Sequence, residues 1–441
     1  MKEERDIFTK NIINFGIGFE AGRANVCNLI NTYYKDMVEQ ASRYKTPVKI
    51  TIFLMYDLQY QGAKEEDFYN IKPEVFKAID LKYITKEDIE NAKKESQNFL
   101  TKQESDLFFG YGHAKGRNTI IYFALKENID YLMFWDDDEY PLACLKEGKS
   151  VTWKKQDNIL MHLKAMEHST ISHGYHCGYV SPIPYVEFGE DISEESFKNF
   201  IEAISNEVIS WDSIKQKMLV NYGITYADKD LSDENGLEYV MKDKWVVATN
   251  LCLNLNKVRE IPAFYNPPNA RGEDTFFSTK LGKAKVVKIP VYHFHDGFLQ
   301  YTGIMENEFP KSLSKIKMNS AKIEKRFYKA CIGWARYKPM LMYVTNKENY
   351  LQNSEIMVNK LNNSIDNMNR LIKHSDCDFR NVLEEFKAYS SRVVLDYQDY
   401  QKINRIWNKI KKRHVLEENG FITINKDKDD IAFMNQTIEN I

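Results

Sequence analysis

The segment YLMFWDDDE, residues 131–139, decides the fold, because five large apolar residues run directly into four acids. A short apolar run of this kind predicts a buried strand. In open α/β sheets ligands bind beyond the carboxyl ends of the strands, so we expect the acids to face a crevice. Adjacent carboxylates repel one another unless a cation is present, and oxygen ligands favour Mg²⁺ or Mn²⁺. The segment therefore predicts a divalent metal site, with a solvated acidic turn as the structural alternative.

The residues before this strand predict a phosphate-binding loop that opens a helix. Segment 110–118, GYGHAKGRN, combines three glycines with Lys115 and Arg117, and a helix is predicted over residues 119–126. Cationic side chains at a helix N-terminus suit phosphate oxygens. A strand that ends in acids, preceded by such a loop, is a more specific pattern than either part alone.

Two further strands are predicted nearer the N-terminus. Residues 12–19 predict the first, followed by a helix that begins near Asn25, and residues 47–55 predict the second, which runs into Asp57. An acid at a strand end can accept hydrogen bonds from a nucleobase or a ribose, although an ordinary turn explains it equally well. The charged, helix-prone residues 58–104 are expected to form an insertion over the sheet.

Candidate chemistry also follows the acidic segment. Residues 245–255 and 286–295 predict buried strands, and between them PPNARGEDTFF, residues 267–277, predicts a loop entering a helix. Glu273 and Asp274 fall in its first turn, where acids stabilise the helix dipole and where a carboxylate can also act as a general base. Alternation along the last strand puts His293 and His295 on one face. Imidazole beside carboxylates favours Mn²⁺ over Mg²⁺, with a structural role for the histidines as the alternative.

Helical character dominates the rest of the chain. A helix is predicted over 153–166, a strand over 174–184 and mainly helices over 190–235, while residues 311–441 predict an all-α C-terminal region after a sheet domain of residues 1–310. In that region one apolar face lies beside a basic run, and it consists of Ile403, Ile406, Trp407 and Ile410. We expect a core face there, with contact to an anionic membrane surface as the alternative.

Composition excludes several classes of protein. Lys+Arg 61 against Asp+Glu 63 gives a net charge of -2, so the chain lacks the overall positive field of a nucleic-acid-binding protein. Its 6 cysteines form no Cys-x-x-Cys pair, which predicts reduced thiols and no zinc or disulfide framework. The N-terminus is charged, and no apolar run approaches the roughly 20 residues that span a bilayer. We therefore expect a cytoplasmic protein without a transmembrane segment.

Taken in order, these motifs resemble the nucleotide-sugar-dependent glycosyltransferases of the GT-A fold, most closely the broad family-2-like group. The resemblance covers roughly residues 12 to 300. The matching pieces are Asp57, Gly116-Arg117-Asn118, Asp136-Asp137-Asp138, Gly272-Glu273-Asp274 and the pair His293 and His295. It implies an α/β fold with a Rossmann-like mixed sheet flanked by helices, to which the C-terminal all-α region is appended.

The resemblance also implies a role for each matched residue. Donor-binding residues would be Asp57 at the base, Arg117 and Asn118 beside the donor, Asp136 at the ribose or sugar, and Asp137 as the middle residue of the acidic motif. Metal ligands would be Asp138, with Asp136 from the same motif, and His293, with His295 as second choice. The general base would be Asp274, with Glu273 as the alternate.

The resulting expectation is a Mn²⁺- or Mg²⁺-dependent enzyme that moves a sugar from a UDP- or GDP-sugar to a hydroxyl of a glycan or glycoconjugate, with inversion. Three alternatives stay open, namely a retaining GT-A transferase, a sugar nucleotidyltransferase and a non-catalytic scaffold that acts through its helical region. The donor sugar, the acceptor and an oligomer formed through the helical region are left open by the sequence.

Overall fold

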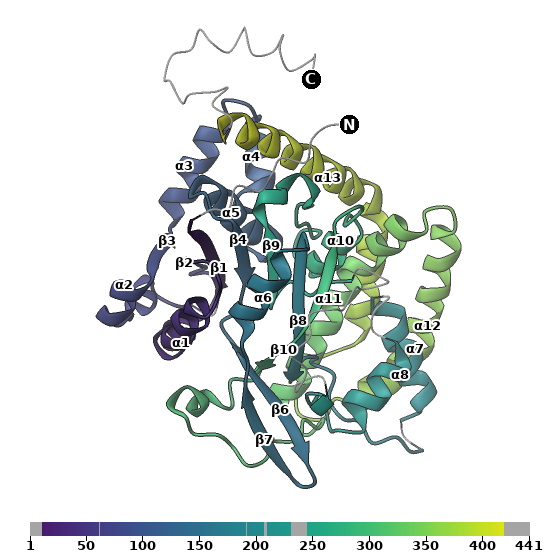
Figure 1. Ribbon diagram of the computed structural model, residues 1–441. Helices are drawn as coiled ribbons and strands as arrows, with labels where there is room; N and C mark the ends of the chain where they lie inside the picture. The colour runs from purple at the N-terminus through teal and green to yellow at the C-terminus, as the bar shows by residue number, and fades with distance from the viewer. Residues whose placement is uncertain (1–10, 61, 191, 207–209, 231–244, 419–441) are drawn as a thin grey trace.

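The computed structural model describes residues 11–60, 62–190, 192–206, 210–230 and 245–418. Within them, an 8-stranded mixed sheet contains, in chain order, Ile13–Ala21 (β1), Val48–Tyr56 (β2), Asp80–Ile84 (β3), Tyr131–Phe134 (β4), Glu139–Tyr140 (β5), Ile171–Gly178 (β8), Leu251–Asn254 (β9) and Val286–His295 (β10). Their order across the sheet is β3-β2-β1-β4-β9-β8-β10-β5. Strands β3, β2, β1 and β4 are parallel, whereas β9 is antiparallel to both of its neighbours. The protein therefore has the α/β fold that the sequence predicts (Figure 1).

Helices cover both faces of the sheet because its strands bury both sets of alternating side chains. In β4, Leu132 and Phe134 belong to one hydrophobic core, whereas Met133 belongs to the core on the other face. Successive strand residues point to opposite faces, so one apolar run serves two helical layers. Helix α5 (His113–Lys126) contributes to the first core, and helices α1 (Asn25–Ser42) and α6 (Asn158–Met166) contribute to the second.

The segment predicted as a helical insertion also supplies a strand. Residues 58–104 contain β3, which pairs in parallel with β2 at the edge of the sheet. Only Ile84 of β3 is fully buried, so the strand lacks the apolar run that would have identified it. Helices α2 (Pro73–Ala78), α3 (Lys86–Ser96) and α4 (Lys102–Phe108) surround it in the chain.

A hairpin takes the place of the start of the helix predicted over residues 153–166. Strands β6 (Leu142–Glu147) and β7 (Ser150–Lys155) pair antiparallel, and α6 follows only from Asn158. Gly148 allows the tight turn, because its φ of 61° is readily adopted only by glycine. The hairpin projects from the foot of the molecule in Figure 1.

Other boundaries shift without changing the type of element. The strand predicted over 174–184 is β8, which begins at Ile171 and ends at Gly178, and the strand predicted over 245–255 shortens to β9. Helices α7 (Glu194–Ile204) and α8 (Trp211–Ile214) occupy part of the segment 190–235, of which residues 191, 207–209 and 231–235 lie outside the described residues. Helix α5 begins at His113, so Arg117 and Asn118 lie in its second turn and not ahead of it.

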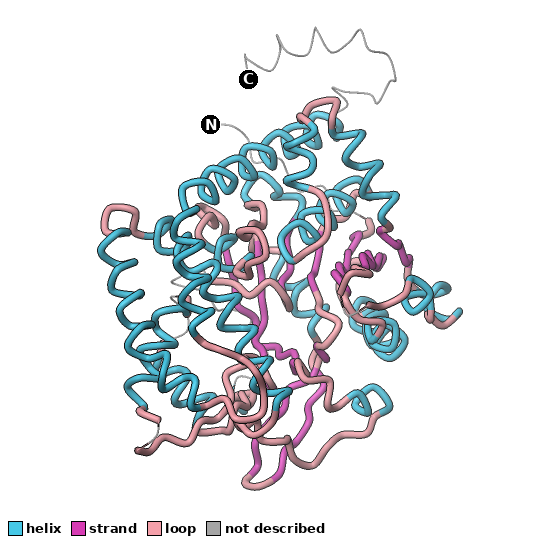
Figure 2. Tube along the Cα trace, turned by 180° about the vertical axis from the view of Figure 1, so that it is seen from behind, coloured by secondary structure: helices cyan, strands magenta, loops and turns pink. Residues whose placement is uncertain are grey.

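The C-terminal region consists of α11 (Ala321–Thr345), α12 (Tyr350–Arg370) and α13 (Arg380–Glu418). Its long helices share a hydrophobic core with the sheet, because Phe327 of α11 and Trp407 of α13 belong to the same cluster as Phe134. Ile403, Ile406, Trp407 and Ile410 are all at most 2% exposed, so this face is a core face and not a membrane contact. Figure 2 shows these helices around the strands from behind, and the predictions for residues 419–441 lie outside the described residues.

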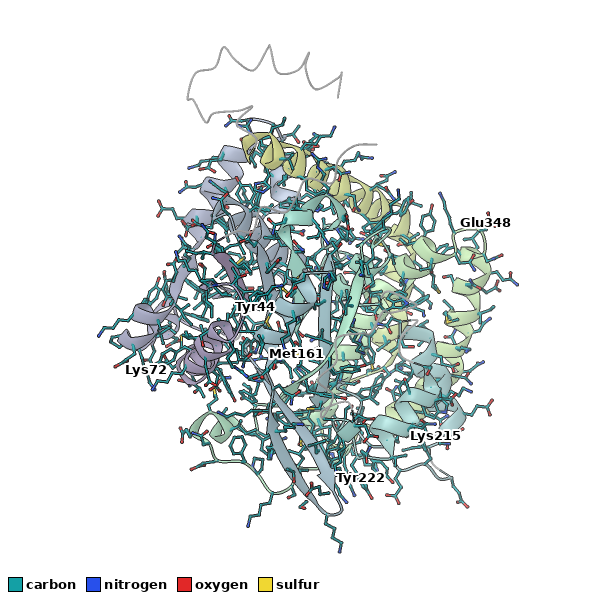
Figure 3. The ribbon with its side chains drawn as sticks, viewed as in Figure 1. Tyr44, Lys72, Met161, Lys215, Tyr222 and Glu348 are labelled. Atoms are coloured by element: carbon teal, nitrogen blue, oxygen red, sulfur yellow. The ribbon has the colours of Figure 1, made fainter. Side chains whose placement is uncertain are left out.

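The outer surface is polar, as side chains such as Lys72, Lys215 and Glu348 show at the periphery in Figure 3. Among the described helices, none combines the length and the apolar character needed to cross a membrane.

Candidate functional site

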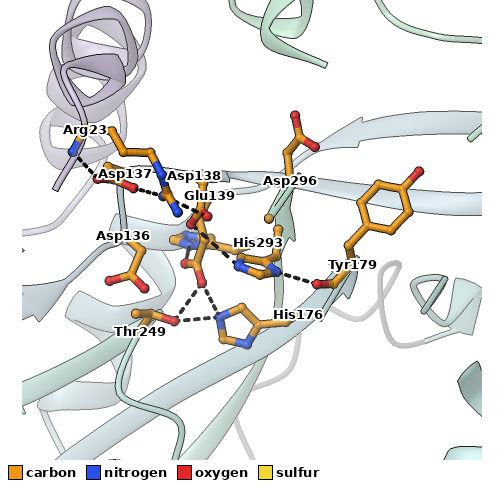
Figure 4. A network of polar contacts seen from close by, with 12 residues as sticks. Arg23, Asp136, Asp137, Asp138, Glu139, His176, Tyr179, Thr249, His293 and Asp296 are labelled. Atoms are coloured by element: carbon orange, nitrogen blue, oxygen red, sulfur yellow. Dashed lines mark hydrogen bonds and ion pairs between the residues drawn. The ribbon is translucent and has the colours of Figure 1, made fainter. Parts of the chain in front are cut away.

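The acids that follow β4 lie at the edge of the sheet where its parallel strands end (Figure 4). The backbone N–H of Trp135 donates to the carbonyl of Gly18 over 3.1 Å, so the chain stays beside β1 until the acids begin. Asp136 keeps 37% of its side chain exposed, whereas Asp137 and Asp138 keep 7%. Asp136 is therefore the acid that a ligand can reach, while the other two are held by the protein.

Asp137 ties the acidic segment to the loop between β1 and α1. Its carboxylate accepts hydrogen bonds from the backbone N–H groups of Gly22 and Arg23, both over 3.0 Å, and contacts the Arg23 guanidinium. Asn25 donates to the Asp137 carbonyl over 2.8 Å. Burial raises the pKa of Asp137 to about 6, against the lowering effect of Arg23. These contacts give Asp137 a positioning role in the loop.

Asp138 lies between a cation and an imidazole. Arg23 Nη1 donates to Asp138 Oδ2 over 3.0 Å, and His295 Nε2 lies 3.6 Å from Asp138 Oδ1. His295 Nδ1 donates to the Tyr179 carbonyl over 2.7 Å, which leaves Nε2 without its proton and able to bind a cation in the neutral ring. Of the two histidines predicted near the metal, it is His295, the second choice, that faces Asp138.

His293 instead joins a buried group beneath the acids. Glu139 Oε2 lies 2.9 Å from His293 Nδ1, and Glu139 Oε1 lies 3.2 Å from His176 Nε2 and 2.7 Å from the hydroxyl of Thr249. Burial alone would raise the pKa of Glu139, but His176 and His293 lower it well below its usual range. One ligand atom from each of Glu139, His176 and His293 lies within 4.8 Å of the others, so the three could hold a metal ion.

Two features of this buried group favour a structural, hydrogen-bonded role over metal binding. Metal-bound histidines almost always donate their second ring N–H to a partner, yet His293 Nε2 is buried without a hydrogen-bond partner among the described residues. His293 is fully buried and its ring centroid lies 4.9 Å from that of Trp135. The carboxylate is already satisfied by three donors from β8, β10 and the segment before β9. The group therefore fixes these elements behind the acids and is closed to a substrate.

Arg117 is the centre of a second charged cluster. Its guanidinium lies 3.3 Å from Asp136, 3.5 Å from Glu20 and 3.6 Å from Glu273, and its side chain is 4% exposed. Glu20 comes from β1, and Glu273 begins helix α10 (Glu273–Ser278). Arg117 therefore brings the acidic segment and the Glu273-Asp274 pair, which are far apart in the sequence, to the same place.

The two acids of α10 differ in their electrostatic surroundings. Burial opposes ionisation of Glu273, but His113 and Arg117 lower its pKa. For Asp274, burial and the neighbouring Glu273 raise the pKa to about 6. The pKa of Asp274 therefore lies above that of a free aspartate, yet the carboxylate stays mainly ionised at neutral pH. A carboxylate with such a pKa is matched to general-base chemistry near neutral pH.

Two predicted donor-binding residues have local structural partners. The Asn118 side chain donates to the Phe264 carbonyl and accepts from the Phe264 N–H, both over 2.9 Å, so its amide joins α5 to that segment. Asp57 lies at the end of β2, at the same sheet edge as the acids, and its carboxylate accepts the backbone N–H of Gln59 over 3.0 Å. Among the described residues, Gln59 is the hydrogen-bond partner found for the Asp57 carboxylate, whereas both ends of the Asn118 amide are taken by Phe264.

A large cleft opens beside this cluster. It has a volume of about 1190 Å³ and lies between the start of α5, residues 264–271 and helices α11 and α13. Its lining is mixed, with Tyr111, His113 and Arg271 on one side and Tyr328 and Lys329 on the other. The cleft borders the Arg117 cluster through His113, whose carbonyl accepts from Arg117 Nη1 over 3.1 Å. A ligand much larger than a single sugar would fit in this cleft.

Several site residues were not predicted from the sequence. Arg23 follows the first strand directly, so the strand-end rule that identified the acids would also have found it. Glu139 was seen only as the fourth acid of the run. His176 and Thr249 carry no local signal, because their place depends on which strands become neighbours.

Comparison with known proteins adds no relative. A scan against models of known protein families gives no match to this chain, and a search of curated proteins gives none either. Any functional conclusion therefore depends on the geometry of the site and on the motif resemblance.

Proposed function

We propose that this protein is a metal-dependent glycosyltransferase of the GT-A fold, which transfers a sugar from a nucleotide-diphosphate sugar to a hydroxyl acceptor with inversion. The observation that carries the proposal is the convergence at Arg117. Asp136 and Glu273, from motifs that the resemblance assigns to the donor and to the base, lie 3.3 and 3.6 Å from one guanidinium. His295 lies 3.6 Å from Asp138 in the same crevice.

The arrangement of the sheet also supports the proposal. Four parallel strands, β3-β2-β1-β4, are followed by the antiparallel β9, and the acids lie immediately after β4. Such a sheet delivers Asp57, Glu20 and the acids to one edge, where α/β proteins bind their ligands.

The residue types at the crevice suit a divalent ion, although among the described residues only Glu139, His176 and His293 already present three ligand atoms close together. Asp138 and Asp136 offer carboxylate oxygens and His295 an unprotonated ring nitrogen, a set that suits Mn²⁺ and tolerates Mg²⁺. Two or three protein ligands are enough where the substrate's phosphates supply the others. When bound, the ion would stabilise the negative charge that develops on the departing diphosphate.

The protein's own residues account for the remaining requirements. Asp274 would take the proton of the acceptor hydroxyl as the new glycosidic bond forms, and Arg117 would keep Glu273 ionised and in place beside it. Arg117 also holds Asp136 at the crevice, where its exposed carboxylate can accept hydrogen bonds from donor hydroxyls. The acceptor would lie in the adjoining cleft, which suits a glycan or a glycoconjugate in size.

Calorimetry with UDP and GDP, in the presence and absence of Mn²⁺, tests the proposal most directly. We expect one nucleotide to bind only in the presence of Mn²⁺. Asp138→Ala should abolish this Mn²⁺-dependent binding. Asp366→Ala, which removes an exposed acid of helix α12, is the matched control and should bind like the wild type. Metal-independent binding that is equal in all three proteins would contradict the proposal.

The products then separate the alternatives. A screen of nucleotide sugars that follows release of the nucleotide diphosphate should identify the donor, and NMR of the product gives the anomeric configuration. Retention would remove the role of Asp274 as base and favour a retaining transferase. Release of pyrophosphate from a nucleoside triphosphate would favour a nucleotidyltransferase.

A further inference from the structure

Two arginines from distant parts of the chain flank the acids. Arg23 follows β1, and Arg326 comes from α11 in the helical region. A Cβ atom at Gly297 would lie 2.3 Å from Arg326 Nη2 and 2.7 Å from His295 Cε1, so Arg326 lies directly beside the imidazole that faces Asp138.

Each guanidinium has an N–H group without a hydrogen-bond partner among the described residues. In both Arg23 and Arg326 this group is the buried Nε–H. Arg326 donates to the Gly297 carbonyl and lies over the ring of Phe298 at 4.3 Å, and no carboxylate of the described residues forms an ion pair with it. Burial lowers the pKa of Arg326, and the nearby charge of Asp138 only partly opposes this effect. Buried donors without partners cost free energy, which an anionic ligand would recover.

Arg23 also occupies the place that a cation would need. Its Nη1 bridges the carboxylates of Asp137 and Asp138, and the one partner found for its Nη2 among the described residues is the Tyr60 hydroxyl, over 3.4 Å. A divalent ion on Asp138 would repel this guanidinium at close range. Arginine presents a planar fork of donors that matches phosphate oxygens, so a diphosphate beside the ion offers it an alternative partner.

We propose that Arg23 and Arg326 together bind the diphosphate of the donor, and that Arg23 neutralises Asp137 and Asp138 until the metal and the diphosphate arrive. This inference rests on the proposed function. It adds a defined ligand, a nucleoside diphosphate, for both arginines, and it makes the helical region part of the donor site.

Substitution of Arg23 should have opposite effects on the affinity for Mn²⁺ and on the affinity for the nucleotide. Arg23→Gln removes the competing charge, so the affinity for Mn²⁺ alone should rise by about tenfold. The same substitution removes a charge-assisted contact, so the affinity for UDP or GDP at saturating Mn²⁺ should fall by roughly tenfold to a hundredfold. Arg326→Gln should weaken the nucleotide to a similar extent and change Mn²⁺ affinity less, because no carboxylate of the described residues forms an ion pair with Arg326.

Titration calorimetry with MnCl₂ alone, and then with UDP or GDP, measures both effects in the full-length protein. Arg43→Gln is the matched control, because Arg43 is also ion-paired, with Asp157, but lies at the far end of α1. Arg23→Lys keeps the charge and should keep the low affinity for Mn²⁺ alone, and thermal melts verify that each variant is folded.

Mn²⁺ affinity that is unchanged or lower in Arg23→Gln would overturn the competition, and so would Mn²⁺ binding that is absent in wild type and variant alike. Nucleotide affinity that is unchanged in both glutamine variants would overturn the diphosphate contact. Failure of the wild type to bind either nucleotide would reject the proposed function itself, whereas the MnCl₂ titration decides the competition on its own.

Discussion

Two histidines on the same strand face, two residues apart, have different surroundings. His293 is fully buried and donates to Glu139, whereas His295 keeps 21% of its side chain exposed and faces Asp138. The sequence places both at the end of the last strand, and alternation puts them on one side. It does not say which one reaches the crevice, because that depends on where β5 and its acids pair with β10.

This difference predicts separate effects of two substitutions. His295→Ala should weaken Mn²⁺-dependent nucleotide binding by on the order of tenfold to a hundredfold, because it removes a candidate ligand. His293→Ala should instead lower the free energy of unfolding by about 3 kcal/mol, since it leaves the buried Oε2 of Glu139 without its donor. Calorimetry measures the first effect and urea unfolding the second. If His293→Ala instead caused the larger loss of Mn²⁺-dependent binding, the metal would be assigned to His293 and the buried group.

The pair Glu273 and Asp274 predicts a pH dependence. A general base must be unprotonated, so the kcat/KM of transfer should rise with pH and reach half of its plateau near the pKa of Asp274, which is about 6. Below that pH the carboxylate is protonated and activity is lost. Asp274→Asn should lower the kcat/KM of sugar transfer by on the order of 10²-fold. It should also remove the rise of kcat/KM with pH, which is the acidic limb of the pH profile. Glu273→Gln should retain this rise of activity with pH but shift it to lower pH, because the Glu273 charge that raises the pKa of Asp274 is removed. A profile that keeps its limb in Asp274→Asn would assign the titration to another group.

At the scale of elements, the sequence identifies those that bury long apolar runs. Strand β10 has the predicted bounds and α1 begins at the predicted residue, because each presents continuous or periodic apolar positions to a core. β3 was missed because its residues are half-buried at a sheet edge, and the β6–β7 hairpin because Trp153 and its neighbours fit either pattern. The acids at the end of β4 were found because strand ends are visible in a sequence. The partners that hold them come from other elements and were not.

Helix α13 allows a test of the shared core. Trp407 stacks on Phe108 with ring centroids 5.8 Å apart and donates to the Ile261 carbonyl over 2.7 Å. Trp407→Ala should therefore lower the free energy of unfolding by about 3–5 kcal/mol, the usual cost of emptying a large aromatic site. Val394→Ala, on the same helix but 54% exposed, should cost much less. Urea unfolding of the two variants provides the comparison, and equal losses would mean that α13 packs loosely on the rest.

At the scale of the whole molecule, the sheet and the C-terminal helices form a continuous body. The last strand of the sheet, β10, ends at His295, before the predicted boundary near residue 310, and one hydrophobic core extends from β4 to α13 across that boundary. A change of periodicity in the sequence indicates where strands give way to helices. It does not indicate whether the helices fold by themselves, because the same apolar face can pack on its own region or on a neighbour.

The chain between β10 and α11 is hydrogen-bonded to strand β7 and to Tyr185. The Trp153 side chain donates to the Pro310 carbonyl over 2.8 Å, the Val151 N–H donates to the Lys311 carbonyl over 2.9 Å, and the Tyr185 N–H donates to the Ile316 carbonyl over 2.7 Å. A protease must draw several residues out into its own active site before it cuts, and these bonds oppose that movement. Brief trypsin treatment of the native protein should therefore leave Lys311 and Lys315 intact, although both side chains are exposed. Two stable fragments that separate at this point would show that the hairpin does not hold the junction.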